Sequence, residues 1–316
     1  MKKLALAYHN LSVMLDAGMP ILRSLETLVS SLDGKFHDAF ATVTKKVISG
    51  QPIAEAMAEH AKIFAPMDIS VIRAADLSGN MAGSLKMLSQ WYEFLNRLKN
   101  IILSGMVLPF VLINITAVIA PLPLLFLHAI NIMGYFAMMI RILALLYIPS
   151  AVIIAVLRLT PKTGILRRLL DAVVLRIPVL GKGIRCLAIS RYCQAFYMLY
   201  KAGIPITECA KTAPSMTGNI VIADLFEPGA DSAQAGKLLS TGFSDRLPTE
   251  FLDLWHIGEE TGELDSVAKR LADMYADTAE HLLTEFTKWL PRLAYFFVCA
   301  IMVIQILKGF GMTMGR

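Results

Sequence analysis

The amino-acid sequence contains two copies of one pattern, and this duplication restricts the possible folds more than any other feature. The segment Ala17-Gly18-Met19-Pro20-Ile21 recurs 185 positions later as Ala202-Gly203-Ile204-Pro205-Ile206. Two further matches follow in the same order, at offsets of 183 and 182: Asp76-Leu77-Ser78-Gly79 with Glu259-Glu260-Thr261-Gly262, and Leu108-Pro109 with Leu290-Pro291. Because matches at nearly constant separation rarely arise by chance, we interpret the chain as two copies of one module. Each copy is a helical domain that runs into an apolar segment.

The composition indicates a membrane protein. Hydrophobic residues make up 56% of the 316 residues, the mean hydropathy is +0.58, and only 17% of residues are charged. Soluble domains carry about 25% charged residues. Uncharged runs extend over residues 100–140, 142–157 and 293–307. The first run is far longer than the roughly 20 residues that one helical crossing requires.

These runs predict three transmembrane helices, at about Ile102–Phe126, Tyr135–Leu157 and Leu290–Leu307. Pro121 and Pro123 leave the end of the first helix undefined. Arg141 lies in the second, where it either reaches the nearby headgroups, which we favour, or marks a functional site.

Basic residues precede the first predicted span and follow the second, whereas the loop at residues 128–134 between the spans has none. By the positive-inside rule both large polar regions are cytoplasmic, and the third span then places the C-terminus in the periplasm. The expected domains are a first cytoplasmic bundle (1–100), two transmembrane helices (101–157), a basic connector with a second bundle (158–288), and a third transmembrane helix with a periplasmic tail (289–316). We do not expect a cleaved signal peptide, because polar residues interrupt the apolar pattern after Lys3.

Each polar region has the apolar periodicity of helices and almost no strand-like alternation. The predicted fold is therefore all-α, with duplicated antiparallel helical bundles of about six helices each. The glycines and prolines of the repeated motifs are expected to be structural turns, in which glycine ends one helix and proline starts the next. These turn residues are Gly18, Pro20, Gly79, Gly203, Pro205 and Gly262. The stretch 214–245 is rich in Gly, Ala, Ser and Asp, and we expect it to be rich in loops.

The motifs resemble those of the inner-membrane platform proteins of type IV pilus and type II secretion machines, the type II secretion F-protein family. The resemblance covers nearly the whole chain. It rests on the duplicated Ala-Gly-(Met/Ile)-Pro-Ile motif, on the connector Ile177-Pro178-Val179-Leu180-Gly181 followed by Ser190-Arg191-Tyr192, and on Gly258-Glu259-Glu260-Thr261-Gly262-Glu263-Leu264-Asp265. The first copy departs from the last motif, because Ala75, Asp76 and Met81 replace its Gly, Glu and Leu. The chain starts almost at the first repeat, as in a short, type IVb-pilus-like member.

The resemblance implies a non-enzymatic scaffold in the bacterial inner membrane that couples a hexameric assembly ATPase to the polymerisation of pilin or pseudopilin subunits. It also implies contacts with other inner-membrane assembly proteins and a homo-oligomeric state. The rival interpretation is a small transporter or channel built from repeats. Three spans, with most repeated residues outside them, disfavour the rival.

The candidate partner-binding residues are Asp76, Glu259 and Glu260. Their carboxylates lie near the ends of helices, where they oppose the helix dipole at a cost of a few tenths of a kcal/mol each. An unfavourable position of this kind indicates that the carboxylates have another role. The carboxylates either face a basic partner or the other bundle, or they cap the following helix or bind a lysine of their own domain, and the sequence leaves both readings open.

No catalytic residues, cofactor or metal site are expected. Leu180-Gly181-Lys182-Gly183 lacks the first glycine and the Ser or Thr of a phosphate-binding loop. His256 and Glu259 share a helix face without a further ligand cluster, and the four cysteines match no metal spacing. The net charge of +5 owes much to the basic residues after the second span, for which we expect anionic lipids and not nucleic acid as partner.

Overall fold

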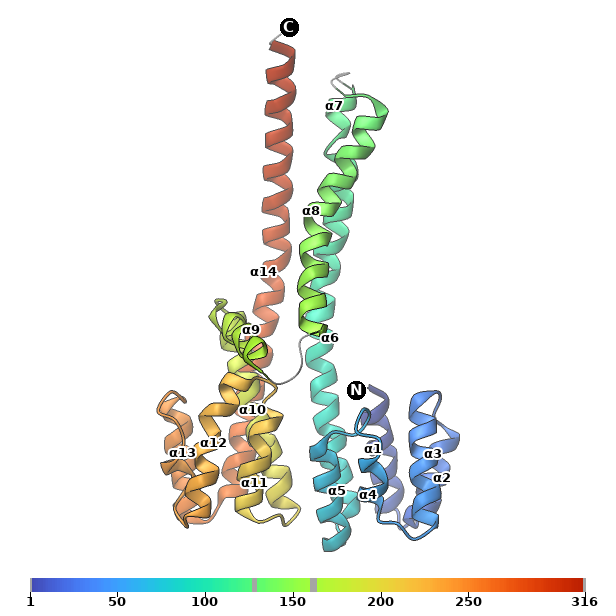
Figure 1. Ribbon diagram of the computed structural model, residues 1–316, viewed down its shortest axis with the longest axis vertical. Helices are drawn as coiled ribbons and strands as arrows, with labels where there is room; N and C mark the ends of the chain where they lie inside the picture. The colour runs from blue at the N-terminus through green and yellow to red at the C-terminus, as the bar shows by residue number, and fades with distance from the viewer. Residues whose placement is uncertain (1, 127–129, 160–163, 315–316) are drawn as a thin grey trace.

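The computed structural model describes residues 2–126, 130–159 and 164–314, and it consists of helices and their connections (Figure 1). Within these three ranges there is no β-strand, so the prediction of an all-α fold is confirmed. The helices form two packed groups at one end of the molecule, and three long helices extend from them towards the other end.

The first group contains six helices, of which the last is also one of the three long ones. These are α1 (Lys2–Asp16), α2 (Ile21–Ser30), α3 (Lys35–Ile48), α4 (Ile53–Ala58), α5 (Pro66–Ser78) and α6 (Met81–Ile119). Helix α1 packs along the lower part of α6, and α5 also packs on α6. A short helix, α7 (Leu122–Phe126), follows α6, and α8 (Ile132–Leu159) runs back along it.

The second group repeats this order after α9 (Ile165–Arg176). Its elements are α10 (Leu180–Lys201), α11 (Ile206–Thr212), the 3₁₀ helix η1 (Ala213–Met216), α12 (Ile220–Gln234), the 3₁₀ helix η2 (Leu239–Thr241), α13 (Thr249–Thr261) and α14 (Leu264–Met314). Helix α10 packs along α14 as α1 packs along α6. The long helices α6 and α14 also pack on each other, which joins the two halves.

The repeated glycines occupy corresponding junctions in the two halves. Gly18 follows α1 and Gly203 follows α10, whereas Gly79 separates α5 from α6 and Gly262 separates α13 from α14. All four have positive φ values, of 82°, 90°, 75° and 75°. Only glycine adopts this left-handed backbone without strain, and the chain reverses at each of these positions.

The expectation that residues 214–245 are rich in loops is wrong for their central part. Helix α12 covers 15 of these residues. The side chain of Asn219 caps its first turn by accepting a hydrogen bond from the Ile222 backbone amide at 3.1 Å. Ile222, Phe226 and Ala230 then bury a stripe at intervals of four residues. The weak intrinsic preference of this segment is overridden by packing.

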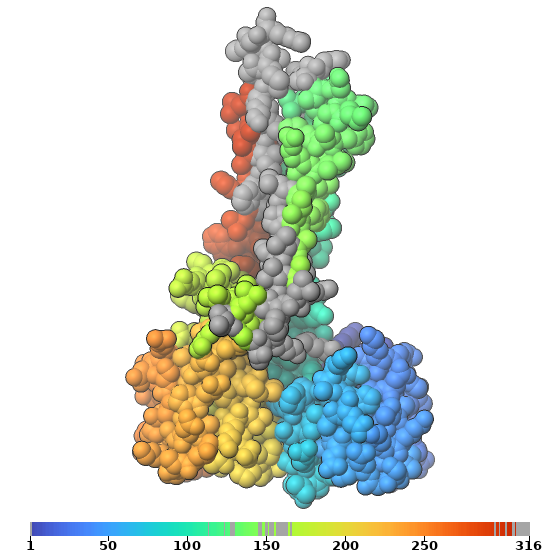
Figure 2. All heavy atoms as spheres, in the orientation of Figure 1, coloured from blue at the N-terminus to red at the C-terminus, as the bar shows by residue number. Residues whose placement is uncertain are grey.

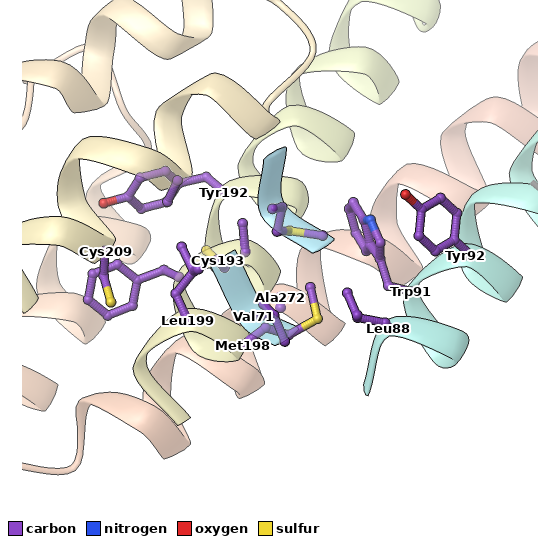
Figure 3. Close-up of a cluster of buried hydrophobic side chains, with 14 of the residues drawn as sticks. Val71, Leu88, Trp91, Tyr92, Tyr192, Cys193, Met198, Leu199, Cys209 and Ala272 are labelled. Atoms are coloured by element: carbon purple, nitrogen blue, oxygen red, sulfur yellow. The ribbon is translucent and has the colours of Figure 1, made fainter. Parts of the chain in front are cut away.

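One continuous core runs through both halves. Val71 of α5 and Leu88 and Trp91 of α6 belong to the same buried cluster as Met198 of α10 and Ala272 of α14 (Figure 3). Because helix α5 packs on α10 and α6 packs on α14, the halves share a buried apolar contact.

The centres of the two halves differ in chemistry. In the first, the fully buried Asp68 accepts hydrogen bonds at Oδ2 from the hydroxyls of Tyr92 at 2.7 Å and Tyr8 at 3.1 Å. In the second, the positions that correspond by the repeat offset hold Phe251, Tyr275 and Cys193. The carboxylate at the centre of this polar network thus has no counterpart at the corresponding position of the second half.

An aromatic cluster fills the second centre. The Tyr192 ring stacks on Phe226 with centroids 3.7 Å apart, and Trp255 lies against Phe196 and Phe251 at 4.9 and 5.4 Å. Burial of several large rings at offset-stacked and edge-to-face distances stabilises this half strongly.

Two helices are long and apolar enough to cross a membrane by length and composition. They lie within Met81–Phe126 and Leu264–Ile304, and only 12% and 7% of their most apolar windows are buried inside the protein. A shorter apolar helix, Ile132–Ala144, belongs to α8. The first predicted span falls within α6 and α7, the second within α8 and the third within α14. The first is interrupted at residues 120–121, where Pro121 lies.

The connector between α9 and α10 is compact. Val179 has a φ of 65°, which is strained for a β-branched residue, and a Cβ atom at Gly181 would lie 2.2 Å from the Leu175 carbonyl oxygen. Glycine at this position lets α9 fold back tightly onto the start of α10.

Candidate partner-binding surface

Both acidic junctions lie at the end of the molecule opposite the tips of the long helices. Helices α6 and α14 start just after Gly79 and Gly262 and rise through the whole height of the structure, so their first turns are at the base in Figure 1. Helices α1 and α10 run the other way, which brings Gly18 and Gly203 to the same end. We call the exposed side chains Asp76, Leu77 and Glu260 at this end the distal surface.

In the first copy the junction between α5 and α6 is open to solvent. Asp76 is exposed and forms no ion pair with any described residue. Its neighbour Leu77 has 86% of its surface exposed, the highest value among the exposed large hydrophobic residues. The junction therefore exposes an apolar side chain and an unpaired carboxylate side by side.

In the second copy Glu259 is used inside its own domain. Its carboxylate accepts hydrogen bonds from the backbone amides of Leu239 at 2.6 Å and Ser240 at 2.9 Å. These amides begin η2, so Glu259 caps that element and holds it against α13. This geometry favours the structural reading of Glu259 over a partner contact.

Glu260 remains exposed. Its carboxylate lies 3.3 Å from Nε2 of His256, one helical turn earlier, and Nδ1 of the same histidine lies 3.1 Å from the Ser240 hydroxyl. An exposed pair of this kind contributes at most a few tenths of a kcal/mol. Glu260 can therefore exchange this contact for one with a basic partner at little cost.

Sequence reasoning placed the three carboxylates at helix ends but missed Leu77. The signal was present in the duplication, because the position that corresponds to Leu77 in the second copy is Glu260. An apolar residue at a position where the other copy carries a charge indicates an exposed site.

The described residues contain no group of three or more His, Cys, Asp or Glu side chains arranged to hold a metal ion. Cys193 and Cys209 are buried, and desolvation raises the pKa of the Cys209 thiol to about 12. Such thiols are unreactive and pack as small apolar side chains.

Comparison with known families gives two matches along the chain. The model of the family described as "Type II secretion system (T2SS), protein F" matches residues 7–129 and again residues 192–308. Together the two matched ranges cover well over half of the chain. They begin 185 positions apart, which is the offset of the glycine–proline motifs.

Individual relatives agree with this match. The chain is 28% identical over 335 residues to a type IV pilus assembly protein PilC of Thermus thermophilus, covering 98% of this chain and 81% of the relative. It is 22% identical to PilC of Myxococcus xanthus, covering 91% and 74%. A type II secretion system protein F of Xanthomonas campestris is 25% identical, covering 84% and 71%.

Proposed function

Since the chain belongs to the protein F family of type II secretion systems, we propose that it is the inner-membrane platform of a type IV pilus or type II secretion machine. In this role it couples a cytoplasmic assembly ATPase to the polymerisation of pilin or pseudopilin subunits. The observation that carries the proposal is the duplication. Two related helical groups lie at one end of the molecule, and apolar helices extend from both towards the other end.

The membrane part of the proposal rests on exposed apolar surface. Phe110 of α6, and Phe296 and Val303 of α14, have more than half of their side-chain surface exposed, as do many of their neighbours. Surface of this extent is stable only against lipid or another protein. We place three crossings, by α6, α8 and the upper part of α14, with the N-terminus in the cytoplasm and the C-terminus in the periplasm.

The distal surface is the proposed contact for the ATPase. It lies at the end of the molecule farthest from the tips of the long helices, which is the cytoplasmic end in this topology. Two related but unequal helix junctions suit a ring of identical subunits, because one chain can meet two neighbouring subunits of the ring. Asp76 and Glu260 supply negative charge and Leu77 supplies apolar area.

The proposed platform takes its energy from this partner. The long helices connect the distal surface with the membrane without a break at the membrane boundary, since α6 and α14 are continuous for 39 and 51 residues. A rotation or shift imposed on the distal surface therefore reaches the membrane part, where the pilin subunits enter the filament. Other inner-membrane assembly proteins and a second copy of the chain are further proposed partners.

The test is co-purification of the full chain with the assembly ATPase of its own organism. The double variant Asp76→Ala with Leu77→Ala should stay at normal membrane levels and lose at least tenfold in ATPase recovery. The matched control, Leu6→Ala with Glu26→Ala, removes an exposed leucine and an exposed carboxylate of the same half away from the distal surface. Equal recovery of the ATPase with both double variants would contradict the proposed contact.

A further inference from the structure

Helix α9 presents an apolar face that no described part of the protein covers. Leu166, Leu169 and Val173 each have close to 60% of their surface exposed, and Ile177 at the helix end is exposed as well. At about 100° per residue, these side chains fall on one arc of the helix. Arg167 and Arg176 lie at the two borders of this arc.

The opposite face of α9 is fastened to the second helical group. Asp171 pairs with Arg167 at 3.2 Å and accepts a hydrogen bond from the Ile220 backbone amide at 3.0 Å. Arg168 forms an ion pair with Asp224 of α12. These contacts fix the rotation of the helix, so its apolar arc points away from the protein.

A cavity of about 970 Å³ lies beneath α9, between it, α10, α12 and the segment around Arg246. Four of its lining residues are basic, Arg168, Lys182, Arg185 and Arg246, and Asp224 is the one acidic residue among them. Because Arg168 is paired with Asp224, the other three cations have no acidic partner among the described residues.

The guanidinium of Arg185 also indicates an anionic ligand in this cavity. One of its terminal nitrogens donates to the Arg246 carbonyl oxygen, but its Nε is buried and has no hydrogen-bond partner in the described part of the chain. A buried guanidinium donor without an acceptor is costly. Phosphate oxygens are well suited to such donors.

The cavity is also apolar on one side and continues into the exposed face of α9. Leu169 belongs both to the exposed arc and to the cavity wall, and Ala172 and Leu175 line the cavity further in. A ligand with a phosphate and a long apolar tail matches this continuity better than a small hydrophilic anion does.

Helix α9 also lies close to the apolar part of α14, as a phospholipid-binding site requires. The first turn of α10, which follows α9, packs at Gly183 against Leu282 and Leu283 of α14. These residues precede the apolar part of α14 by about two helical turns, or about 12 Å. Closer to that part, the Arg292 guanidinium lies 5.1 Å from the centre of the exposed Trp289 ring, as in a membrane-interface pair.

We propose that α9 lies in the cytoplasmic interface of the bilayer and that the cavity beneath it binds the phosphate headgroup of an anionic phospholipid. The apolar arc of α9 contacts the acyl boundary, and the exposed Arg176 reaches the headgroups beside it. The three cations without an acidic partner, Lys182, Arg185 and Arg246, hold one headgroup in place. This inference rests on the proposed membrane placement and is independent of the ATPase contact.

The first test is a native mass-spectrometric titration of the detergent-solubilised full chain with equal amounts of phosphatidylglycerol and phosphatidylcholine. We expect one phosphatidylglycerol to bind with about tenfold preference, and Lys182→Gln with Arg246→Gln to abolish the preference. The control Lys237→Gln with Arg270→Gln makes the same charge change at exposed sites outside the cavity and should leave the preference intact. No preference in the wild type, or equal loss in the control, would overturn the proposal.

A further arm distinguishes a lipid site from a site for a free anion. Inorganic phosphate at the same concentration as phosphatidylglycerol should not displace the lipid, because it lacks the contacts of the acyl chains. Full displacement would assign the cavity to a soluble anion and would refute the lipid proposal.

The second test measures the depth of α9 directly. An environment-sensitive fluorophore on Val173→Cys, with Cys186 and Cys299 replaced by Ser, is placed in nanodiscs that contain brominated phosphatidylcholine. Quenching should exceed that of the same label on Lys237→Cys at least threefold, because Val173 then lies at the acyl boundary. Equal quenching at the two positions would show that α9 does not enter the interface.

Discussion

The hydroxyl of Tyr92 should stabilise the first half of the protein, whereas the corresponding hydroxyl of Tyr275 should not stabilise the second. Tyr92 donates to the buried carboxylate of Asp68 at 2.7 Å, which is a short hydrogen bond. In the second copy Phe251 occupies the position of Asp68, and the Tyr275 hydroxyl has no hydrogen-bond partner among the described residues. The substitutions Tyr92→Phe and Tyr275→Phe remove the same atom from two related sites.

The magnitude follows from the burial of the carboxylate. Asp68 is fully buried, and after Tyr92→Phe its Oδ2 retains only the Tyr8 hydroxyl and the Ala65 amide, both at 3.1 Å. Its Oδ1 is already without a partner in the described chain. Loss of a hydrogen bond to a buried charged group costs about 2 kcal/mol, whereas Tyr275→Phe should change stability by less than about 0.5 kcal/mol.

The effect of Tyr92→Phe should depend on pH. Burial raises the pKa of Asp68 from 3.8 to about 6, against the opposing effect of its hydrogen bonds. Because the folded pKa lies above the unfolded value, the folded state binds more protons between pH 4 and 6. The contribution of Asp68 to the free energy of unfolding is therefore greatest below pH 4 and falls by up to about 3 kcal/mol as the pH rises to 6. Removing the Tyr92 donor destabilises mainly the ionised carboxylate, so the penalty should be larger at pH 7.5 than at pH 5.

Native-state hydrogen exchange of the full chain in detergent separates the two halves. Amides of α1 and α5 report on the first half, and those of α10 and α13 report on the second. We expect Tyr92→Phe to lower the opening free energy of α1 and α5 by about 2 kcal/mol at pH 7.5 and by about half as much at pH 5. If the two Tyr→Phe substitutions had equal effects, or if the Tyr92→Phe penalty did not change with pH, this account of the Asp68 network would be refuted.

Three further predictions concern the junctions and the membrane part. Glu259→Ala should lower stability by about 1–3 kcal/mol, because it leaves two amides of η2 without an acceptor, whereas Glu260→Ala should leave thermal unfolding unchanged; equal effects would contradict the capping role. Gly203→Val, at a φ of 90°, should reduce the amount of folded protein in the membrane by a backbone strain of about 1–3 kcal/mol, and normal abundance of this variant would contradict the turn assignment. Reporter fusions at Asn131 and Arg316 should both read as periplasmic, and a cytoplasmic readout at Arg316 would remove the third crossing.

The sequence was sufficient to predict the all-α class and the family because both depend on local, repeated signals. Glycine–proline turns and apolar periodicity survive in each copy, and their order carries the resemblance. The helix α12 was missed because its stability comes from burial of Phe226 and from the Asn219 cap, whereas the composition of the segment indicated loops.

The candidate site was predicted only in part. The positions of Asp76, Glu259 and Glu260 at helix ends could be read from the glycines that follow them. Their roles could not, because Glu259 is fixed by η2, a segment 19–20 residues away in the chain. Contacts of this kind depend on tertiary packing, and no local pattern in the sequence predicts them. The cavity under α9 could not be predicted either, although the basic residues after the second predicted span, which include Arg168, had already suggested anionic lipid as a partner.

The central claim is that the distal surface meets the assembly ATPase while the opposite end lies beyond the membrane. The most direct measurement places a photo-reactive amino acid at Leu77, and separately at Phe126, in cells that assemble filaments. Both side chains are strongly exposed, at 86% and 79%. Leu77 belongs to α5, at the base of the molecule, and Phe126 ends α7, at the opposite end (Figures 1 and 2). The account predicts a covalent adduct with the ATPase from Leu77 and none from Phe126. An ATPase adduct from Phe126, or its absence from Leu77 in cells with normal filaments, would contradict the account.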